Sequence, residues 1–140
     1  MRYLNPEELR GADRDEAHQE LEEHVGKNLK DGVAIDVTSR YASLVNLKKD
    51  SKVLDIGTAS GAFAKQLFNA GYSNIYGLDI DKYLSPENEK LFKEFRTSNL
   101  SFDKLPWPDG YFDLVTAWCV LPHLENPFQA IREIYRVLSK

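Results

Sequence analysis

Cysteine is almost missing from this chain of 140 residues, in which Cys119 is the only one. A single cysteine excludes an intramolecular disulfide, and no cluster of histidine and cysteine has the spacing of a metal site. No apolar run is long enough to cross a bilayer, so we expect no membrane contact. Dense runs of lysine and arginine are also missing and the net charge is −4, which disfavours a broad nucleic-acid-binding surface.

The first fifty residues have a helical pattern, and we expect residues 1–50 to form an N-terminal helical cap. Asn5-Pro6-Glu7-Glu8 is a capping box that starts a helix running to about residue 29. A second amphipathic helix is expected over about 33–47. The strongly charged N-terminus does not fit a signal peptide, so we expect a soluble, cytoplasmic protein.

The first predicted helix carries five acidic or histidine side chains close together in sequence: His18, Glu20, Glu22, Glu23 and His24. They could be imagined as metal ligands, but nothing nearby in the sequence reads as a convergent partner. A solvated helix face is therefore favoured, and no metal is expected.

From about residue 51 the expected elements alternate between strand and helix. Strands are expected over 52–56, 74–78, 95–98 and 112–118, and helices over 62–70, over 86–95 after a Ser85 cap, and after Asn126-Pro127. This alternation predicts an α/β fold, a Rossmann-like parallel sheet with helices on both faces, and right-handed crossovers give the strand order 3-2-1-4. The buried stripe of the last helix is expected to consist of Ile131, Ile134, Tyr135 and Leu138.

The most informative segment is VLDIGTASGAFA, which spans residues 53–64. A buried strand stops at Gly57 and a helix opens after Gly61, so free N–H groups and an accessible backbone are available to a small ligand. The next strand ends on Asp79, where a carboxylate can accept both hydroxyls of a ribose. These features predict a nucleoside-bearing cofactor.

Asp55 argues against a dinucleotide as that cofactor. A pyrophosphate over the turn requires a GxGxxG spacing, whereas this turn reads Gly57-x-Ala59-x-Gly61. An acid just before the turn repels a pyrophosphate but suits the cationic amino group of an aminoacyl cofactor. A dinucleotide-dependent oxidoreductase is therefore disfavoured, and the plain structural alternative is a buried Asp55 that only bonds loop amides.

Four segments in order resemble the motifs of class I S-adenosylmethionine-dependent methyltransferases, in the small-molecule, type 11-like branch. They are residues 55–61 (DIGTASG), 77–81 (GLDID), 105–115 (LPWPDGYFDLV) and 120–138, which begins VLPHLENP. The resemblance covers about residues 52–140 and implies S-adenosylmethionine as cofactor and a small-molecule methyl acceptor. The Asn-Pro-Pro-Tyr-type motif of DNA and protein amide methyltransferases is absent, since residues 117–120 read AWCV.

The resemblance implies that the methionine end of the cofactor lies along Asp55, Gly57, Thr58, Ala59 and Gly61. Ala59 stands where the family usually has its middle glycine, and the extra methyl group is tolerable if φ is negative. Asp79 is expected to take the ribose hydroxyls, and Ile80 to lie against one adenine face.

Other site residues implied by the resemblance follow the third and fourth strands. Asn99 and Leu100 are expected to end the third strand and to read the adenine edge, although Asn99 suits a turn equally well. Trp118 can form the floor beneath the sulfonium by cation–π attraction, or be buried under the last helix. His123 can act as a general base, or as a structural histidine that bonds the loop backbone.

Class I methyltransferases carry seven strands, and this sequence stops after the helix that follows the fourth. We therefore expect residues 51–140 to be the cofactor-binding half of a methyltransferase domain that lacks the C-terminal strands. A second copy or a partner chain is expected to cover the edge of the fourth strand. The runner-up hypothesis is a non-catalytic S-adenosylmethionine-binding module, or pseudoenzyme, that acts through a partner.

Overall fold

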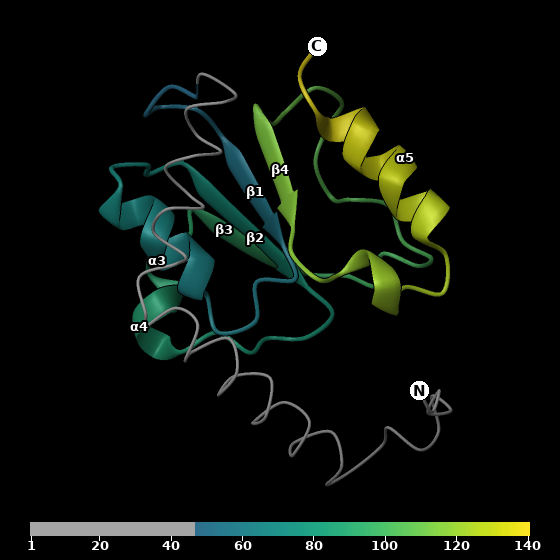
Figure 1. The fold of residues 1–140 in the computed structure, drawn as a ribbon, viewed down its shortest axis with the longest axis horizontal. Helices are drawn as coiled ribbons and strands as arrows, with labels where there is room; N and C mark the ends of the chain where they lie inside the picture. Colours follow the sequence, from purple (N-terminus) through teal and green to yellow (C-terminus); the bar gives the residue numbers. More distant parts are fainter. Residues whose placement is uncertain (1–46) are drawn as a thin grey trace, which may run out of the picture. The chain divides into compact units, whose positions relative to one another are not determined.

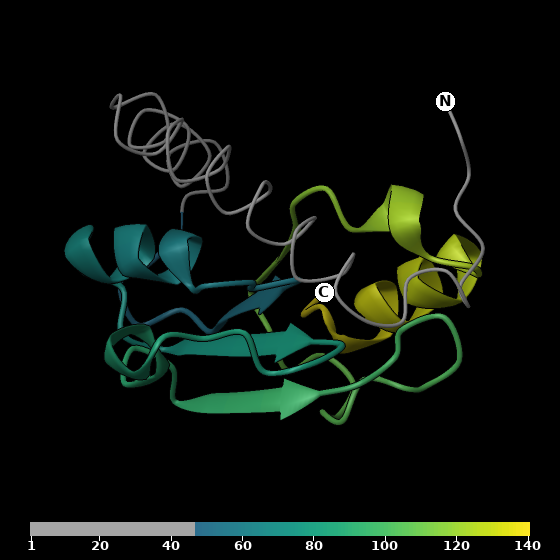
Figure 2. The same ribbon diagram turned by 90° about the horizontal axis from the view of Figure 1, so that it is seen from below.

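A parallel sheet with flanking helices is formed by residues 47–140, the part of the chain that the computed structural model describes (Figure 1). Its strands are β1 (Val53–Ile56), β2 (Ile75–Asp79), β3 (Glu94–Thr97) and β4 (Leu114–Ala117), in the order β3-β2-β1-β4. Every pairing is parallel, and Figure 2 shows neighbouring strands pointing the same way. The predicted fold and strand order are confirmed, whereas the two helices predicted before residue 47 lie outside the described residues.

Alternation of side chains along the strands distributes the core over both faces of the sheet. Val53 packs with Ala64 and Leu67 of α3 (Ala62–Asn69), whereas the next residue, Leu54, shares a cluster with Ala130 of α5 (Pro127–Val137). Figure 1 shows α3 and α5 on opposite sides of the sheet. Helices therefore cover both faces, as predicted. Within the described residues no helix is both long and apolar enough to cross a membrane.

The helix α4 (Pro86–Glu89) begins where predicted but is shorter than predicted. Ser85 caps it, because its Oγ accepts a hydrogen bond from the Asn88 N–H at 3.2 Å. The helix ends well before residue 95 because the chain turns there and the Phe92 ring packs on the sheet at Gly77. A Cβ atom at Gly77 would lie 2.7 Å from this ring. A glycine inside a buried strand leaves the space that the ring occupies.

The predicted buried stripe of α5 is only partly confirmed, since Ile134 packs against the core. The residues of α5 that are buried are Ala130, Glu133 and Val137. Ile131 and Tyr135, which we expected in the core, are 48% and 69% exposed. The helix is rotated because the Glu133 carboxylate is held inside, where its Oε2 accepts a hydrogen bond from the Leu105 N–H at 2.9 Å and pairs with Arg136 at 2.7 Å.

After α5 the chain returns to the sheet beside the start of β4. The Phe112 N–H donates to the Val137 carbonyl at 2.9 Å, and the Ser139 N–H donates to the Phe112 carbonyl at 2.8 Å. These two bonds form an isolated parallel bridge between Phe112 and Leu138. Among the described residues, the outer edge of β4 itself (Leu114–Ala117) has no paired strand.

Candidate functional site

The carboxyl ends of β1, β2 and β4 meet the N-terminus of α3 at one edge of the sheet, toward which the strand arrows point in Figure 1. Ligands of open α/β sheets bind at this kind of edge. The turn at residues 57–61 lies here between β1 and α3, and Asp79 is the last residue of β2. The structure thus brings together the main residues that the sequence assigned to one site.

The turn has a left-handed backbone at alternate residues. The φ angles are 73° at Gly57, 45° at Ala59 and 84° at Gly61. The condition of a negative φ, under which the methyl group of Ala59 would be tolerable, is therefore not met, and a side chain in this region costs about 1–2 kcal/mol. The Asp79 Oδ2 atom accepts a hydrogen bond from the Ala59 N–H at 2.9 Å, and this bond from the neighbouring strand helps to hold the strained residue.

Asp55 is 2% exposed and lies directly before the turn. Its Oδ1 atom accepts a hydrogen bond from the Thr116 hydroxyl of β4 at 2.9 Å. Burial raises the pKa of Asp55 to about 7; the Thr116 hydrogen bond opposes this shift and the negative charge of Asp79 adds to it. The site therefore has a buried acid that is near its titration point at neutral pH.

The Thr58 hydroxyl is a buried polar group that lacks a hydrogen bond. Thr58 is 5% exposed, and within residues 47–140 its Oγ1 atom has no hydrogen-bond partner. A buried hydroxyl without a partner costs about 1–3 kcal/mol. A polar ligand group that reaches this atom would recover that free energy, so the observation favours a ligand with polar groups at the turn.

The glycines that open and close the turn also have packing roles. A Cβ at Gly57 would overlap the Cγ2 atom of Val120, and a Cβ at Gly61 would lie 3.0 Å from both Leu84 and Asn88. The turn is thus packed by side chains that follow β2 and β4. The sequence predicted that these two glycines give the ligand access to the backbone, but it did not predict that neighbouring side chains pack against them.

The residues assigned to the nucleoside lie at different depths. Ile80 is exposed, and its N–H donates to the Asp79 Oδ1 atom at 2.7 Å. Asn99 and Leu100 do not end β3 as expected, because the strand stops at Thr97. The Asn99 side chain accepts a hydrogen bond from the Ser101 N–H at 3.1 Å, which fits the turn role, and Leu100 is buried in the core.

The two residues assigned after β4 are accessible. Trp118 is 42% exposed, and its ring lies 5.6 Å from that of Phe63 of α3, so it does not lie buried under α5. His123 is exposed in the short 3-10 helix η1 (Leu121–His123), where its backbone N–H donates to the Val120 carbonyl at 2.9 Å. Both residues are therefore available to a ligand at the strand ends.

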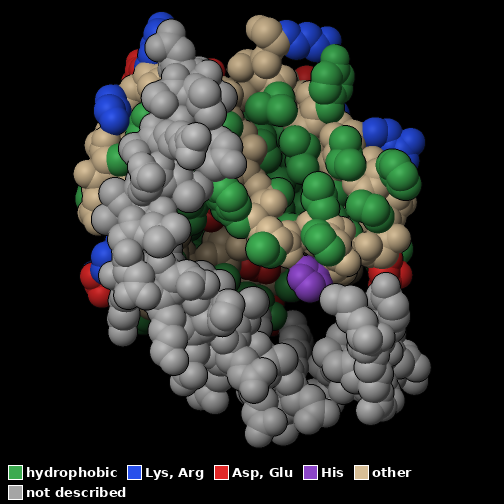
Figure 3. Space-filling model, in the orientation of Figure 1, with side chains coloured by type: hydrophobic (Ala, Val, Ile, Leu, Met, Phe, Trp, Pro, Cys, Tyr) green, Lys and Arg blue, Asp and Glu red, His purple; other side chains and the backbone are tan. Residues whose placement is uncertain are grey.

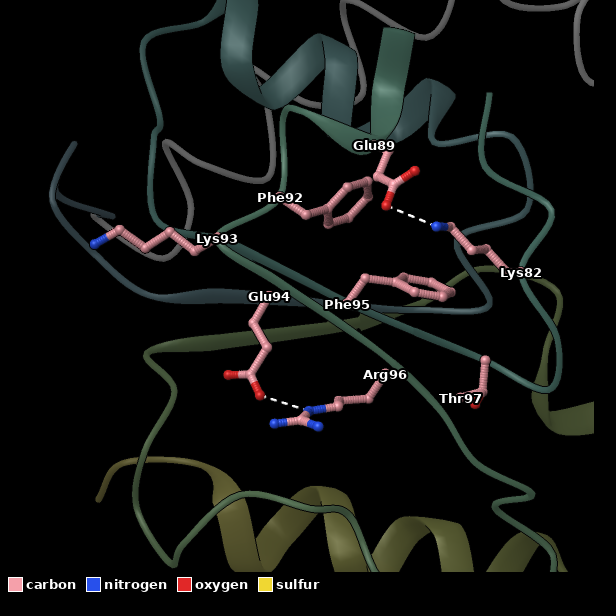
Figure 4. Close-up of a pocket in the computed structure, with 8 residues that line it drawn as sticks. All are labelled: Lys82, Glu89, Phe92, Lys93, Glu94, Phe95, Arg96 and Thr97. Carbon is pink, nitrogen blue, oxygen red and sulfur yellow. Dashed lines mark hydrogen bonds and ion pairs between the residues drawn. The ribbon is translucent and has the colours of Figure 1, made fainter. Parts of the chain in front are cut away.

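A groove of about 540 Å³ lies along β3 at the outer edge of the sheet (Figure 4). Phe95 lies in it between two ion pairs, Lys82 with Glu89 and Arg96 with Glu94, each at 2.6 Å. The four charged side chains of these ion pairs are therefore already neutralised by each other. The buried acid and the Thr58 hydroxyl lie instead at the end of β1, and the candidate site is therefore the one at this end.

Sequence reasoning missed two polar contacts of the site. Thr116 stands opposite Asp55 in the β1–β4 register, and a polar residue in an apolar strand beside a buried acid was the signal for it. Asn88 donates from its side chain to the Ser60 carbonyl at 2.8 Å. No local pattern indicates this bond, because it joins residues 28 positions apart.

Comparison with known proteins gives the same reading of the fold. The profile of a family described as a methyltransferase domain matches residues 54–140. The 27-O-demethylrifamycin SV methyltransferase of Amycolatopsis mediterranei is 30% identical over 73% of this chain and 40% of its own length. The ubiquinone/menaquinone biosynthesis C-methyltransferase UbiE of Neisseria meningitidis is 35% identical over 67% of this chain and 41% of its own length. The chain thus spans about two fifths of the length of these relatives.

Solved structures share the fold at lower identity. A crystal structure from Methanococcus maripaludis, described as that of an S-adenosyl-L-methionine-dependent methyltransferase, has a TM-score of 0.74 at 20% identity. It matches 89% of this chain and 59% of its own. A chain in a complex of a Haloferax volcanii methyltransferase activator with a methyltransferase has a TM-score of 0.58 at 21% identity, over 81% of this chain and 54% of its own.

Proposed function

The chain belongs to the methyltransferase domain family, whose cofactor is S-adenosylmethionine, and we propose that its reaction is methyl transfer to a small-molecule acceptor. The observation that carries the proposal is the buried Asp55 beside a turn whose Thr58 hydroxyl has no hydrogen-bond partner among residues 47–140. An acid and a hydroxyl at this depth fit a ligand end that carries both a cation and polar groups, as the amino acid end of this cofactor does.

Four of the candidate residues have proposed parts in holding the cofactor. Asp55 faces its ammonium group, and the charge of that group offsets the repulsion between Asp55 and Asp79. Asp79 accepts the ribose hydroxyls, and the exposed side chain of Ile80 covers the adenine. Trp118 attracts the sulfonium through its ring face. These roles are proposed because Asp79 ends β2 and Trp118 directly follows β4, at the sheet edge that carries the turn.

When bound, S-adenosylmethionine supplies a methyl group on a sulfonium, which is already activated for transfer. The chain's own residues then have to orient the acceptor and exclude water. His123 is exposed beside the end of β4 and can accept a proton from an oxygen or carbon acceptor. A small acceptor is favoured because the names of the two relatives refer to rifamycin and to quinones.

The open edge of β4 supports a second part of the proposal, that a second copy or a partner chain completes the domain. Beyond the Phe112–Leu138 bridge, the described residues leave this edge unpaired. Hydrophobic side chains gather over β4 and α5 on the face seen in Figure 3. An open strand edge with an apolar surround favours pairing with another chain.

The alternative is a non-catalytic module that binds S-adenosylmethionine and acts through a partner. Its support is one structural neighbour, a methyltransferase that is in a complex with a methyltransferase activator. The enzyme and the non-catalytic module require the same cofactor site, but only the enzyme would methylate an acceptor.

Calorimetry with S-adenosylhomocysteine and NAD on one sample tests the cofactor site. We expect the first compound to bind and the second not to bind, because Asp55 repels a pyrophosphate. Tighter binding of NAD would overturn the proposal. A product assay over a panel of phenolic and quinol acceptors then separates the enzyme from the non-catalytic module.

A further inference from the structure

The side chain of Asn88 joins α4 to the glycine turn. Asn88 donates from Nδ2 to the Ser60 carbonyl at 2.8 Å, across 28 positions of sequence. Its own backbone N–H donates to the Ser85 hydroxyl, the cap of α4, at 3.2 Å. The side chain that reaches the turn therefore extends from a fixed point in α4.

Close packing limits how far the Asn88 side chain can move from the turn. A Cβ at Gly61 would lie 3.0 Å from the Cβ of Asn88 and 3.0 Å from Cδ2 of Leu84. The absence of a side chain at Gly61 is therefore what lets α4 approach the turn. At this separation the Asn88 amide reaches the Ser60 carbonyl directly.

The turn needs such ties because Ala59 has a φ of 45°, a region that favours glycine. Two side chains hold the residues on either side of the Ala59–Ser60 peptide. Asp79 accepts from the Ala59 N–H at 2.9 Å, and Asn88 donates to the Ser60 carbonyl at 2.8 Å. Asp79 is already assigned to the cofactor, whereas Asn88 has no other part in the site.

We infer that Asn88 is a positioning residue, which holds the Ser60 carbonyl and thereby keeps the turn in the shape that receives the methionine end of the cofactor. The inference rests on the proposed function, because it presumes that the turn contacts that end. Without the Asn88–Ser60 hydrogen bond, we expect the turn to change its backbone conformation, because that change relieves the strain at Ala59. We expect the ribose and adenine residues, Asp79 and Ile80, to be affected less, because Asp79 is held by β2 and Ile80 directly follows it.

The test compares two ligands on the full chain by calorimetry. Asn88→Asp keeps the shape of the side chain but removes the donor, and it sets a carboxylate oxygen against the Ser60 carbonyl. We expect affinity for S-adenosylhomocysteine to fall about fivefold or more, the effect of losing one hydrogen bond. Affinity for 5′-methylthioadenosine, which lacks the amino acid end, should change less than about twofold.

Glu87→Gln is the matched control. It removes the ion pair between Glu87 and Lys65, an exposed tie between α4 and α3 at 3.3 Å, and leaves the Ser60 carbonyl untouched. Both ligands should bind this variant as they bind the wild type. In an Ala59→Gly background, the loss caused by Asn88→Asp should shrink, because glycine adopts the same φ without strain.

Three results would count against the inference. Unchanged affinity of Asn88→Asp for S-adenosylhomocysteine would show that the tie does not matter. An equal loss for both ligands would show a general structural role, which the thermal unfolding temperature of each variant would also register. A wild-type protein that binds neither ligand would overturn the proposed function, and this inference with it.

Discussion

Asp55 of β1 and Thr116 of β4 are joined by a hydrogen bond of 2.9 Å, in which the hydroxyl donates to the buried carboxylate. The bond favours the ionised form of Asp55, while burial raises its pKa to about 7. The proposed cofactor site thus includes a contact between two strands that are far apart in the sequence. Its pH dependence follows from the same contact.

Thr116→Val should move the pH dependence of cofactor binding. The variant removes the hydrogen bond that lowers the pKa of Asp55, so this pKa should rise further above about 7. Since the proposed ammonium contact needs the ionised acid, affinity for S-adenosylhomocysteine should weaken as the pH falls through the pKa of Asp55. The midpoint of that loss, measured by calorimetry over a pH series, should lie at higher pH in Thr116→Val. An unchanged midpoint would separate Asp55 from the binding step.

Asp55→Asn should stabilise the fold at neutral and higher pH. The pKa of Asp55 is raised by folding, so the folded state binds an extra proton between the unfolded value near 3.8 and about 7, and stability falls as the pH rises through this window. An amide carries no charge to bury, so the gain should be on the order of 4 kcal/mol at about pH 8 and vanish below about pH 4. Urea unfolding at both pH values measures it. S-adenosylhomocysteine should bind the variant more weakly.

Asp79→Ala should weaken cofactor binding through two losses. Two charge-assisted hydrogen bonds to the ribose would disappear, worth roughly 2–4 kcal/mol together. The Ala59 N–H would also lose its acceptor at 2.9 Å. Calorimetry with S-adenosylhomocysteine measures the change. A loss of less than about threefold in a folded variant would remove Asp79 from the site.

Glu133→Gln should destabilise the protein without touching the cofactor site. The hydrogen bond from Arg136 is the largest cause that lowers the pKa of Glu133, and the Leu105 N–H adds to it. A lowered pKa contributes stability above the unfolded value, which is lost as the pH falls through the folded value. The variant should therefore lose about 1–3 kcal/mol at neutral pH and show a smaller acid-induced loss. Arg132→Gln, at an exposed neighbour, should leave the unfolding free energy unchanged.

Local signals were sufficient for the strands and for the starts of the helices. The run before Gly57 is apolar and ends at a glycine, and Asn126 caps α5 with its side chain as its sequence suggests. Such features need only neighbouring residues. The strand order then follows from the handedness of the connections.

Features that depend on distant contacts could not be predicted. The orientation of α5 depends on the bond between Glu133 and the Leu105 N–H, 28 positions away. The positive φ of Ala59 is accompanied by a bond to Asp79, 20 positions away. In the site, the sequence therefore identified which residues gather but not the contacts that hold them in place.

The open edge of β4 leads to a prediction about self-association. If a second copy covers β4 and α5, the exposed Ile131 and Tyr135 of α5 lie in or beside the interface. Ile131→Glu and Tyr135→Glu should then shift the chain from a dimer or larger assembly toward a monomer in sedimentation velocity, because a charge would be buried against an apolar surface. Neither variant should lower the unfolding temperature of the monomer, since both side chains are exposed. Phe68→Glu, on the exposed side of α3 across the sheet, introduces the same charge and should leave the assembly intact. A wild-type chain that sediments as a monomer at all concentrations, and that turns over an acceptor, would show that the β4 edge needs no second copy.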